Sequence, residues 1–185
     1  MKRSILFVYC LVITFSSLSA QSEQSYSSYD WIIQTGVGFI ANDFEGDMKV
    51  PPVDIAIEKV INEKIAVGAY IGYASYHDVI YPAGQLFSKD IGYNYGYTLI
   101  GGSISNHFKE ISADLDLYAR VYLGYALVSA STFGLGKLDS KAQSSFAVYG
   151  GYVGATIYLM PGFGLNGEVG YGNTSIIRVG LSFRM

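Results

Sequence analysis

The last eleven residues, 175–185, read SIIRVGLSFRM and decide the fold class. Every second residue is apolar: Ile177, Val179, Leu181, Phe183 and Met185. The residues between them are small, polar or positive: Arg178, Gly180, Ser182 and Arg184. Because side chains two residues apart share a face of a β-strand, this segment predicts a strand with one apolar face and one polar face.

The order of these residues is also specific. Arg178, Gly180, Phe183 and Met185 fit the pattern polar–x–Gly–x–x–aromatic–x–hydrophobic. This resembles the C-terminal signal by which the barrel assembly machinery recognises outer-membrane barrels. The usual last residue of that signal is Phe, whereas this chain has Met185, which is also apolar and is flexible. The resemblance implies that these four residues form an assembly signal.

The composition favours a barrel in lipid over a soluble domain. The 185 residues are enough for one domain, and half of them are hydrophobic while only 15% are charged. Soluble domains usually carry about a quarter charged residues. The chain holds 17 Tyr and 22 Gly, and its apolar residues alternate instead of forming helix-length runs. Such a composition suits a barrel with a lipid-facing exterior and a polar interior.

Few residues of the chain suit redox or metal chemistry. Cys10 is the only cysteine, and His77 and His107 are the only histidines. The sequence therefore predicts no disulfide, no thiolate catalyst, no metal site and no cofactor. The charge balance is acidic, with 12 Lys and Arg against 15 Asp and Glu, and contains no basic patch. Nucleic acid is consequently not expected as a partner.

The N-terminus has the form of a secretory signal peptide. Lys2 and Arg3 precede an apolar run over 5–15, and small residues follow up to Ala20. We expect residues 1–20 to be a cleaved leader, with cleavage after Ala20 or after Ser19. The apolar run is shorter than the about 20 residues that a membrane-spanning helix needs.

The rest of the chain divides into two predicted parts. Residues 21–29 are polar and Ser-rich and form a flexible lead-in, and residues 30–185 form the barrel domain. Eight strands are predicted: 30–41, 53–61, 65–76, 94–106, 114–130, 145–160, 164–171 and 175–185.

Long and short connections alternate along these strands. The long ones are 42–52, 77–93 and 131–144, and all four Pro are assigned to turns or loops, with the pair Pro51-Pro52 arguing against a central strand. Transmembrane barrels have short periplasmic turns and longer outer loops. This pattern predicts periplasmic termini and three long outer loops.

Alternation also predicts which residues point into the barrel. In the fourth strand we favour Thr98, Ile100, Gly102 and Ile104 outward, although Leu99 argues for the opposite. The inward charged residues are Asp54, Glu58, Asp116, Arg120, Glu168, Arg178 and Arg184. Of these, five are predicted to form an inward polar network: Glu58, Asp116, Arg120, Glu168 and Arg178. A three-residue connection over 172–174 places Glu168 directly opposite Arg178, where Cβ atoms about 4.5–5.5 Å apart permit an ion pair.

The chain as a whole resembles the small OmpA/OmpX-like outer-membrane β-barrels of Bacteroidetes-type bacteria. The resemblance rests on the leader, on DLDLYARVYLGY at 114–125, on EVGYG at 168–172 and on the VGLSFRM ending. It implies an all-β, eight-stranded, antiparallel, up-and-down transmembrane barrel in the outer membrane of a Gram-negative bacterium. The expected surroundings are lipid and lipopolysaccharide, and the expected state is a monomer. A soluble, lipocalin-like barrel is disfavoured because the face opposite the apolar one is mostly Gly, Ala and Tyr.

Three functions are compatible with such a barrel. The first is a non-catalytic barrel with a side-chain-filled interior, which presents the loops 42–52, 77–93 and 131–144 for surface structure, interaction or adhesion. The second is an outer-leaflet lipid enzyme, similar to lipid A deacylases or acyltransferases, that would use Ser75, His77 and Asp78; the deacylase order of His before Ser is reversed here. The third is a narrow ion channel. The sequence favours the first and does not identify a ligand.

Overall fold

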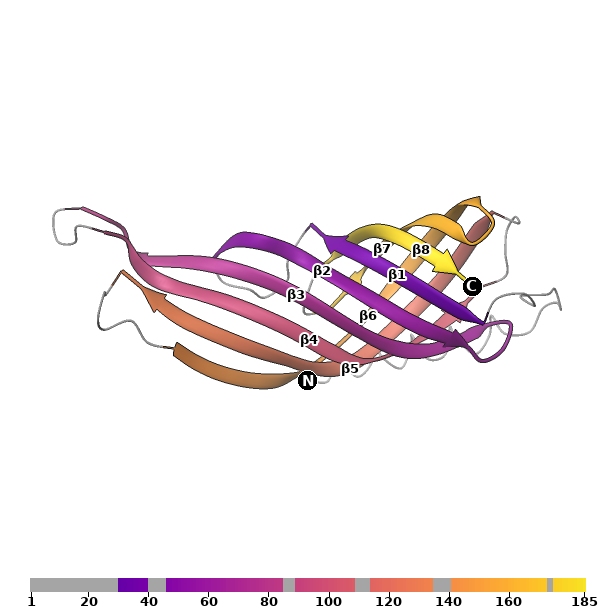
Figure 1. Ribbon diagram of the computed structural model, residues 1–185, viewed down its shortest axis with the longest axis horizontal. Coiled ribbons are helices and arrows are strands. Elements are labelled where there is room, and N and C mark those ends of the chain that lie inside the picture. The colour runs from indigo at the N-terminus through magenta and orange to yellow at the C-terminus, as the bar shows by residue number, and fades with distance from the viewer. Residues whose placement is uncertain (1–29, 40–45, 85–88, 109–113, 135–140, 173–174) are drawn as a thin grey trace, which may run out of the picture.

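The computed structural model describes residues 30–39, 46–84, 89–108, 114–134, 141–172 and 175–185. They form eight strands: β1 (Trp31–Gly38), β2 (Asp47–Val60), β3 (Ile65–Tyr81), β4 (Ile91–His107), β5 (Leu115–Phe133), β6 (Lys141–Met160), β7 (Phe163–Tyr171) and β8 (Ile177–Arg184). Each strand pairs antiparallel with the next, and β1 pairs with β8, so the sheet closes into a barrel (Figure 1). The predicted all-β, eight-stranded, up-and-down fold is confirmed. Within these residues no helix has the length and apolar character needed to cross a membrane.

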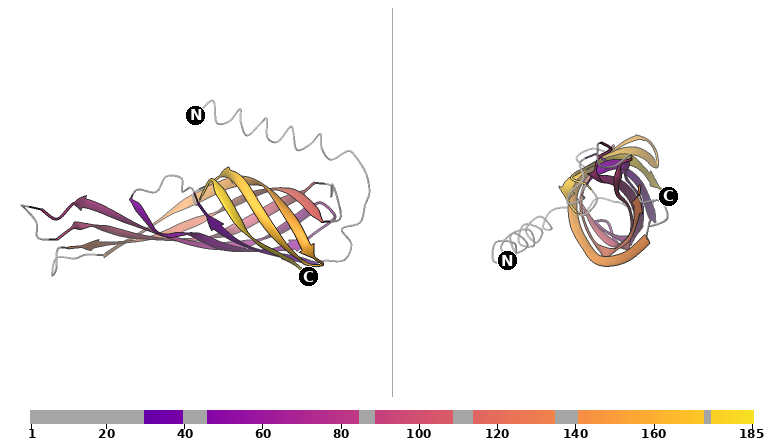
Figure 2. Two further views of the ribbon diagram at one scale, coloured as in Figure 1. Left: turned by 90° about the horizontal axis from the view of Figure 1, so that it is seen from above. Right: turned by 90° about the vertical axis from the view of Figure 1, so that its left-hand side faces the viewer.

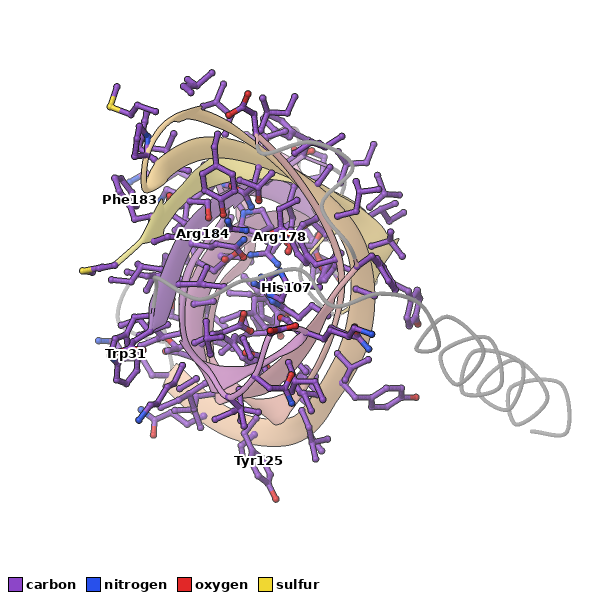
Figure 3. All side chains as sticks on the ribbon, turned by 90° about the vertical axis from the view of Figure 1, so that its right-hand side faces the viewer. Trp31, His107, Tyr125, Arg178, Phe183 and Arg184 are labelled. Atoms are coloured by element: carbon purple, nitrogen blue, oxygen red, sulfur yellow. The ribbon has the colours of Figure 1, made fainter. Side chains whose placement is uncertain are left out.

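Side chains of the closed part of the barrel alternate between a mainly apolar exterior and an interior that holds the charged residues Glu58, Arg120 and Glu168. On β4, Ile100 is 52% exposed while the neighbouring Leu99 is fully buried, so the predicted facing of this strand is the observed one. Figure 3 shows Trp31, Tyr125 and Phe183 on the outside of the ring, and it shows Arg178, Arg184 and His107 inside it. The arrangement is the inverse of a soluble barrel, which buries its apolar side chains.

The register of the closing strands follows from the outward and inward sets. β7 and β8 pair Phe163 with Phe183 and Glu168 with Arg178, as predicted. β8 then pairs with β1, where Phe183 lies opposite Ile33. The predicted turn residues Asn173 and Thr174 lie outside the described residues.

The strands differ greatly in length, and this shapes the molecule. β3, β4, β5 and β6 have 17 to 20 residues, whereas β1, β7 and β8 have eight or nine. The pairing of β6 with β7 stops at Gly151, and the pairing of β2 with β1 stops at Val53. The outer parts of β2 to β6 therefore continue beyond the closed barrel as an open sheet (Figure 2). We call this sheet the extension: residues 47–52, 74–81, 91–98, 127–133 and 141–147.

The extension corrects the predicted loop boundaries. The predicted loop 77–93 contains the end of β3 and the start of β4, and the predicted loop 131–144 likewise contains parts of β5 and β6. These segments include polar residues such as His77, Asp78, Ser131 and Gln143, which are common in loops, yet the structure places them in strands. The remaining loop residues 40–45, 85–88 and 135–140 lie outside the described residues.

Two further boundaries were wrong. Pro51 and Pro52 belong to β2, where the register shifts between Val50 and Val53. Because the pairing with β1 ends at Val53, these prolines lie on an edge and at a bulge, the two places where a strand tolerates a missing N–H. The predicted fourth strand, 94–106, also ends one residue too early, because β4 runs through His107.

Candidate functional sites in the barrel interior and on the extension

A buried ion network fills the middle of the barrel, with Arg120 of β5 at its centre. Arg120 Nη1 lies 2.9 Å from Glu168 Oε1, and Arg120 Nη2 lies 3.1 Å from Glu58 Oε2. Its Nε also donates to Ser105 Oγ at 3.0 Å, and its Nη2 donates to Gln34. All three ionised side chains are at most 3% exposed. Buried charges persist only when paired and hydrogen-bonded, so this cluster is a tightly coupled unit.

Arg178 extends the network toward β2. Its Nη1 lies 2.7 Å from Glu168 Oε2, as the predicted register requires, and its Nη2 pairs with Asp54. Tyr118 donates to Glu168 Oε1 at 2.9 Å, and Ser103 donates to Glu58 Oε1 at 2.6 Å. The network thus joins β1, β2, β4, β5, β7 and β8 across the lumen.

Asp116, the fifth predicted member, belongs to a separate cluster at the end of the barrel near the chain's last residue. His107 Nδ1 and Arg184 Nη2 lie 2.9 Å and 2.6 Å from Asp116 Oδ2. The guanidinium of Arg184 also lies 4.0 Å from the ring centre of Tyr158, a cation–π contact. Sequence reasoning had not placed His107 inside, although its even spacing from the inward Ser103 carries that signal.

Above the ion network the lumen is closed by rings and aliphatic side chains. Tyr70 and Tyr152 both contact the ring of Tyr122, with ring centres 5.0 Å and 5.8 Å apart. Beyond them, Leu99, Ala126 and Val148 are each at most 1% exposed and pack together. The cavity between the ion network and these rings measures about 20 Å³, roughly the space of one water molecule. Side chains of the described residues thus occupy most of the lumen at this level.

The predicted catalytic candidates on β3 do not assemble into a triad. Ser75 and His77 share the outward face, but Asp78 follows on the opposite one. His77 Nδ1 lies 2.7 Å from Asn94 Oδ1, and its ring stacks on Phe133 with centres 4.3 Å apart. A serine triad needs the base hydrogen-bonded to the nucleophile and oriented by a third group, and the contacts of His77 do not include Ser75. The described part of the chain also holds no group of three His, Cys, Asp or Glu residues that could bind a metal.

The residues of the proposed assembly signal lie at the seam of the barrel. Arg178 points inward to the ion network, and Gly180 lies against the backbone of Thr35. Phe183 contacts Phe163 on the exterior, with ring centres 5.1 Å apart. The backbone of Met185 exchanges hydrogen bonds of 2.8 Å and 3.0 Å with Trp31, so the last residue pairs with the first strand.

A groove on the outward face of the extension was not anticipated from the sequence. Its volume is about 830 Å³, and half of its lining residues are Ser, Thr, Asn or Gln, among them Ser75, Thr98, Ser129 and Gln143. The sequence predicts strands at Ser75, Thr98 and Ser129 but loops at Ser131 and Gln143, so it does not place these residues on one surface. The signal that identifies the groove is the spacing by two of Ser129 and Ser131 on β5 and of Gln143 and Ser145 on β6.

Comparisons with known proteins give a fold and no closer relation. No family model matches the chain, and no curated protein matches its sequence. A major outer membrane protein of Thermus thermophilus has a similar structure, with a TM-score of 0.62 and 12% identity over 86% of this chain and 100% of that one. Ail, the attachment invasion locus protein of Yersinia pestis, solved in complex with the heparin analogue sucrose octasulfate, has a TM-score of 0.50 and 13% identity over 84% and 93%. The chain therefore has the barrel fold of small outer-membrane proteins, as its resemblance to the OmpA/OmpX-like kind implied.

Proposed function

We propose that this chain is an integral, non-catalytic protein of the bacterial outer membrane whose extension stands outside the cell as an interaction surface. The observation that carries the proposal is the inverted polarity of the closed barrel. Its exterior is apolar, with Leu123 67% exposed and Val153 64% exposed, while the charged side chains of Glu58 and Arg120 are buried. Hydrocarbon is the environment that matches such an exterior, and only a closed sheet satisfies its backbone there.

The extent of the apolar exterior fits a bilayer. On β5 the outward residues run from Leu115 to Leu127 and are all apolar, and a tilted strand needs about 9–11 residues to span. Aromatic rings end this belt on the outer side, where Tyr73, Tyr125 and Tyr149 are 43% to 67% exposed. Trp31 and Phe183 mark the other side, and amphipathic rings favour such interfacial positions.

The two ends of the barrel are unlike, which supports an orientation. The connections from β2 to β3 and from β6 to β7 are short and lie at the end that holds Met185, whereas the extension lies at the other end (Figure 1). Since transmembrane barrels keep short turns in the periplasm, this orientation places the extension outside and the termini in the periplasm.

The extension has the properties of a recognition surface. Tyr93, Tyr95 and Tyr97 form a row of half-buried rings on its inner face, with successive ring centres 5.8 Å and 6.3 Å apart. Among the described residues, 141–150 of β6 pair with a strand on one side only. Ail is by name an attachment and invasion protein, so this fold is able to carry such a role. We therefore favour surface interaction or adhesion over catalysis or conduction, and a monomer in lipopolysaccharide-containing membrane.

We propose that the barrel assembly machinery recognises the C-terminal residues Arg178, Gly180, Phe183 and Met185 before β1 and β8 pair. After these strands pair, Arg178 is buried and Met185 is hydrogen-bonded to Trp31. Changing Phe183 and Met185 together to Ser should lower the yield of assembled barrel, and an unchanged yield would contradict an assembly signal at these residues.

One experiment tests location and the absence of catalysis together. In a Gram-negative host, the processed chain should fractionate with the outer membrane and run faster on gels when unheated than when boiled. Lipid A from cells expressing the wild type, His77→Ala or an empty vector should give identical mass spectra. Recovery from the soluble periplasm would overturn the membrane assignment, and a lipid A species that depends on His77 would overturn the non-catalytic one.

A further inference from the structure

The groove on the outward face of the extension has a defined floor and rim. Gly96 of β4 lies at its floor, between Ser75 of β3 and Ser129 of β5, to which it is paired. Tyr73 leans over this floor: a Cβ added to Gly96 would lie 3.5 Å from the Tyr73 hydroxyl. Lys49 of β2, at a bulge in its strand, forms the rim on one side. The cavity of about 830 Å³ exists because the central side chains are small.

Several polar side chains of the groove make no hydrogen bond to another described side chain, although Asn94 contacts His77. Ser75 is 9% exposed, yet it makes no hydrogen bond to another described residue, and the same is true of Thr98, Ser129 and Gln143. The Ser75 hydroxyl lies in the wall of the cavity without a protein partner, so it is available to a ligand there. Hydroxyl and amide groups both donate and accept, which complements the hydroxyls of a saccharide.

The charge of the groove further restricts the chemical class of its ligand. Lys49 is the only charged residue among the described side chains that line it. An ammonium at the rim of a neutral, hydroxyl-lined cavity suits a saccharide that carries an anionic substituent such as a phosphate. A polyanion would meet a single cation here and would leave most of its charge unpaired.

The position of the groove indicates where this saccharide comes from. The outward row next to Tyr73, Thr98 and Leu127 toward the barrel consists of Ile71, Ile100 and Tyr125, which belong to the apolar belt. A ligand in the groove therefore lies directly above lipid chains that cover the belt. We propose that the groove binds the anionic saccharide headgroup of an outer-leaflet glycolipid while its acyl chains lie along Ile71 and Ile100. This inference rests on the proposed membrane orientation.

The test compares two glycine variants of β4 that differ only in their height on the same outward face. Gly96→Val fills the floor of the groove, where the new Cβ meets only ordinary contacts of 3.5 Å and more. Gly102→Val adds the same side chain within the belt, where the nearest atom is 3.6 Å away. Refolded protein in phosphatidylcholine vesicles with increasing fractions of rough lipopolysaccharide is extracted into mild detergent, and bound lipopolysaccharide is measured by native mass spectrometry.

We expect saturable binding to the wild type and to Gly102→Val, a roughly tenfold weaker apparent affinity for Gly96→Val, and a roughly threefold weaker one for Lys49→Gln, which loses one exposed charge contact. Equal binding by wild type and Gly96→Val would overturn the groove as the site. Equally tight binding of the same saccharide freed of its acyl chains would overturn the lipid-anchored source. Heat-modifiable gel mobility is measured in the same samples to show whether the barrel has inserted. An inserted barrel without selective binding would contradict only the glycolipid site. A chain that does not insert would contradict both the site and the membrane assignment.

Discussion

The closed barrel and the part of the extension next to it are built from the same strands, but their faces have opposite polarity. On β5, Arg120 points inward and Leu123 outward in the barrel, whereas further along the same strand Val128 points inward and Ser129 outward. β3 reverses in the same way: Ile71 is outward and apolar, and Ser75, two residues after Tyr73, is outward and polar. The reversal occurs on both strands at the row of Tyr73 and Leu127.

The difference shows that alternation of polar and apolar residues specifies a strand. Which face is polar depends on whether that face meets lipid, water or the barrel interior. In the barrel the exterior meets hydrocarbon, and the interior must satisfy its own polar groups. In the extension the exterior meets water and headgroups, so hydroxyls point out, and the hydrophobic effect gathers the Tyr rings on the inner face. A strand that passes from one medium to the other continues with the same backbone conformation, but its polar and apolar side chains change sides.

The largest expected effect comes from breaking the barrel's interior. Glu168→Gln should lower the free energy of unfolding by about 3–5 kcal/mol, because it removes a buried carboxylate that pairs with both Arg120 and Arg178 and leaves each with a single acidic partner. Arg178→Gln should cost a similar amount, and a double-mutant cycle of the two should give a coupling energy of about 2 kcal/mol. The measurement is urea unfolding in lipid vesicles, followed by the fluorescence of Trp31.

The control for this cycle combines Glu168→Gln with Asp116→Asn. Asp116 pairs with His107 and Arg184 and shares no ion-pair partner with Glu168, so the two changes should add to within about 0.5 kcal/mol. Strict additivity of Glu168→Gln with Arg178→Gln would show that the charges are solvated independently.

A smaller loss of stability is expected when a lysine is placed on the exterior of β5, either within the apolar belt or in the extension. Leu123→Lys puts an ammonium in the belt and should cost about 2–4 kcal/mol if that position is near the bilayer midplane. Ser129→Lys, on the same strand and face, should stay within about 0.5 kcal/mol of the wild type. Unfolding in vesicles measures both, and equal costs would contradict the boundary between barrel and extension at this row.

The smallest effect should come from the inner face of the extension. Tyr95→Leu keeps an apolar side chain but removes two ring contacts, with Tyr93 and Tyr97, and should cost about 1 kcal/mol. The loss should be local, so amide exchange should quicken over 91–98 and stay unchanged near Arg120 in the barrel. Faster exchange throughout the barrel would show that the extension does not open independently of it.

The sequence by itself determined the strand order, the facing of the strands and the register of the last pair. Alternation places Ile100 outside and Leu99 inside, and a short connection with inward residues on both strands leaves Glu168 opposite Arg178. Both inferences need only the local geometry of a strand and of neighbouring strands. The same argument underestimated the lengths of β3 to β6. Beyond Tyr73 and Leu127 the outward side chains face water instead of lipid, so the outward residues resemble those of loops.

Only the tertiary structure decided which inward charges meet across the lumen and where a cavity forms. Asp116 and Arg120 lie four residues apart on one face of β5, yet Asp116 binds Arg184 and Arg120 binds Glu58 and Glu168. These pairings depend on the tilt and stagger of the closed barrel, which no single strand contains. The groove depends on Lys49, Ser75, Gly96 and Ser129 being brought together by four strands. Alternation predicts the face on which each of these residues lies. Which residues lie next to it depends on how the barrel closes and on how long each strand is.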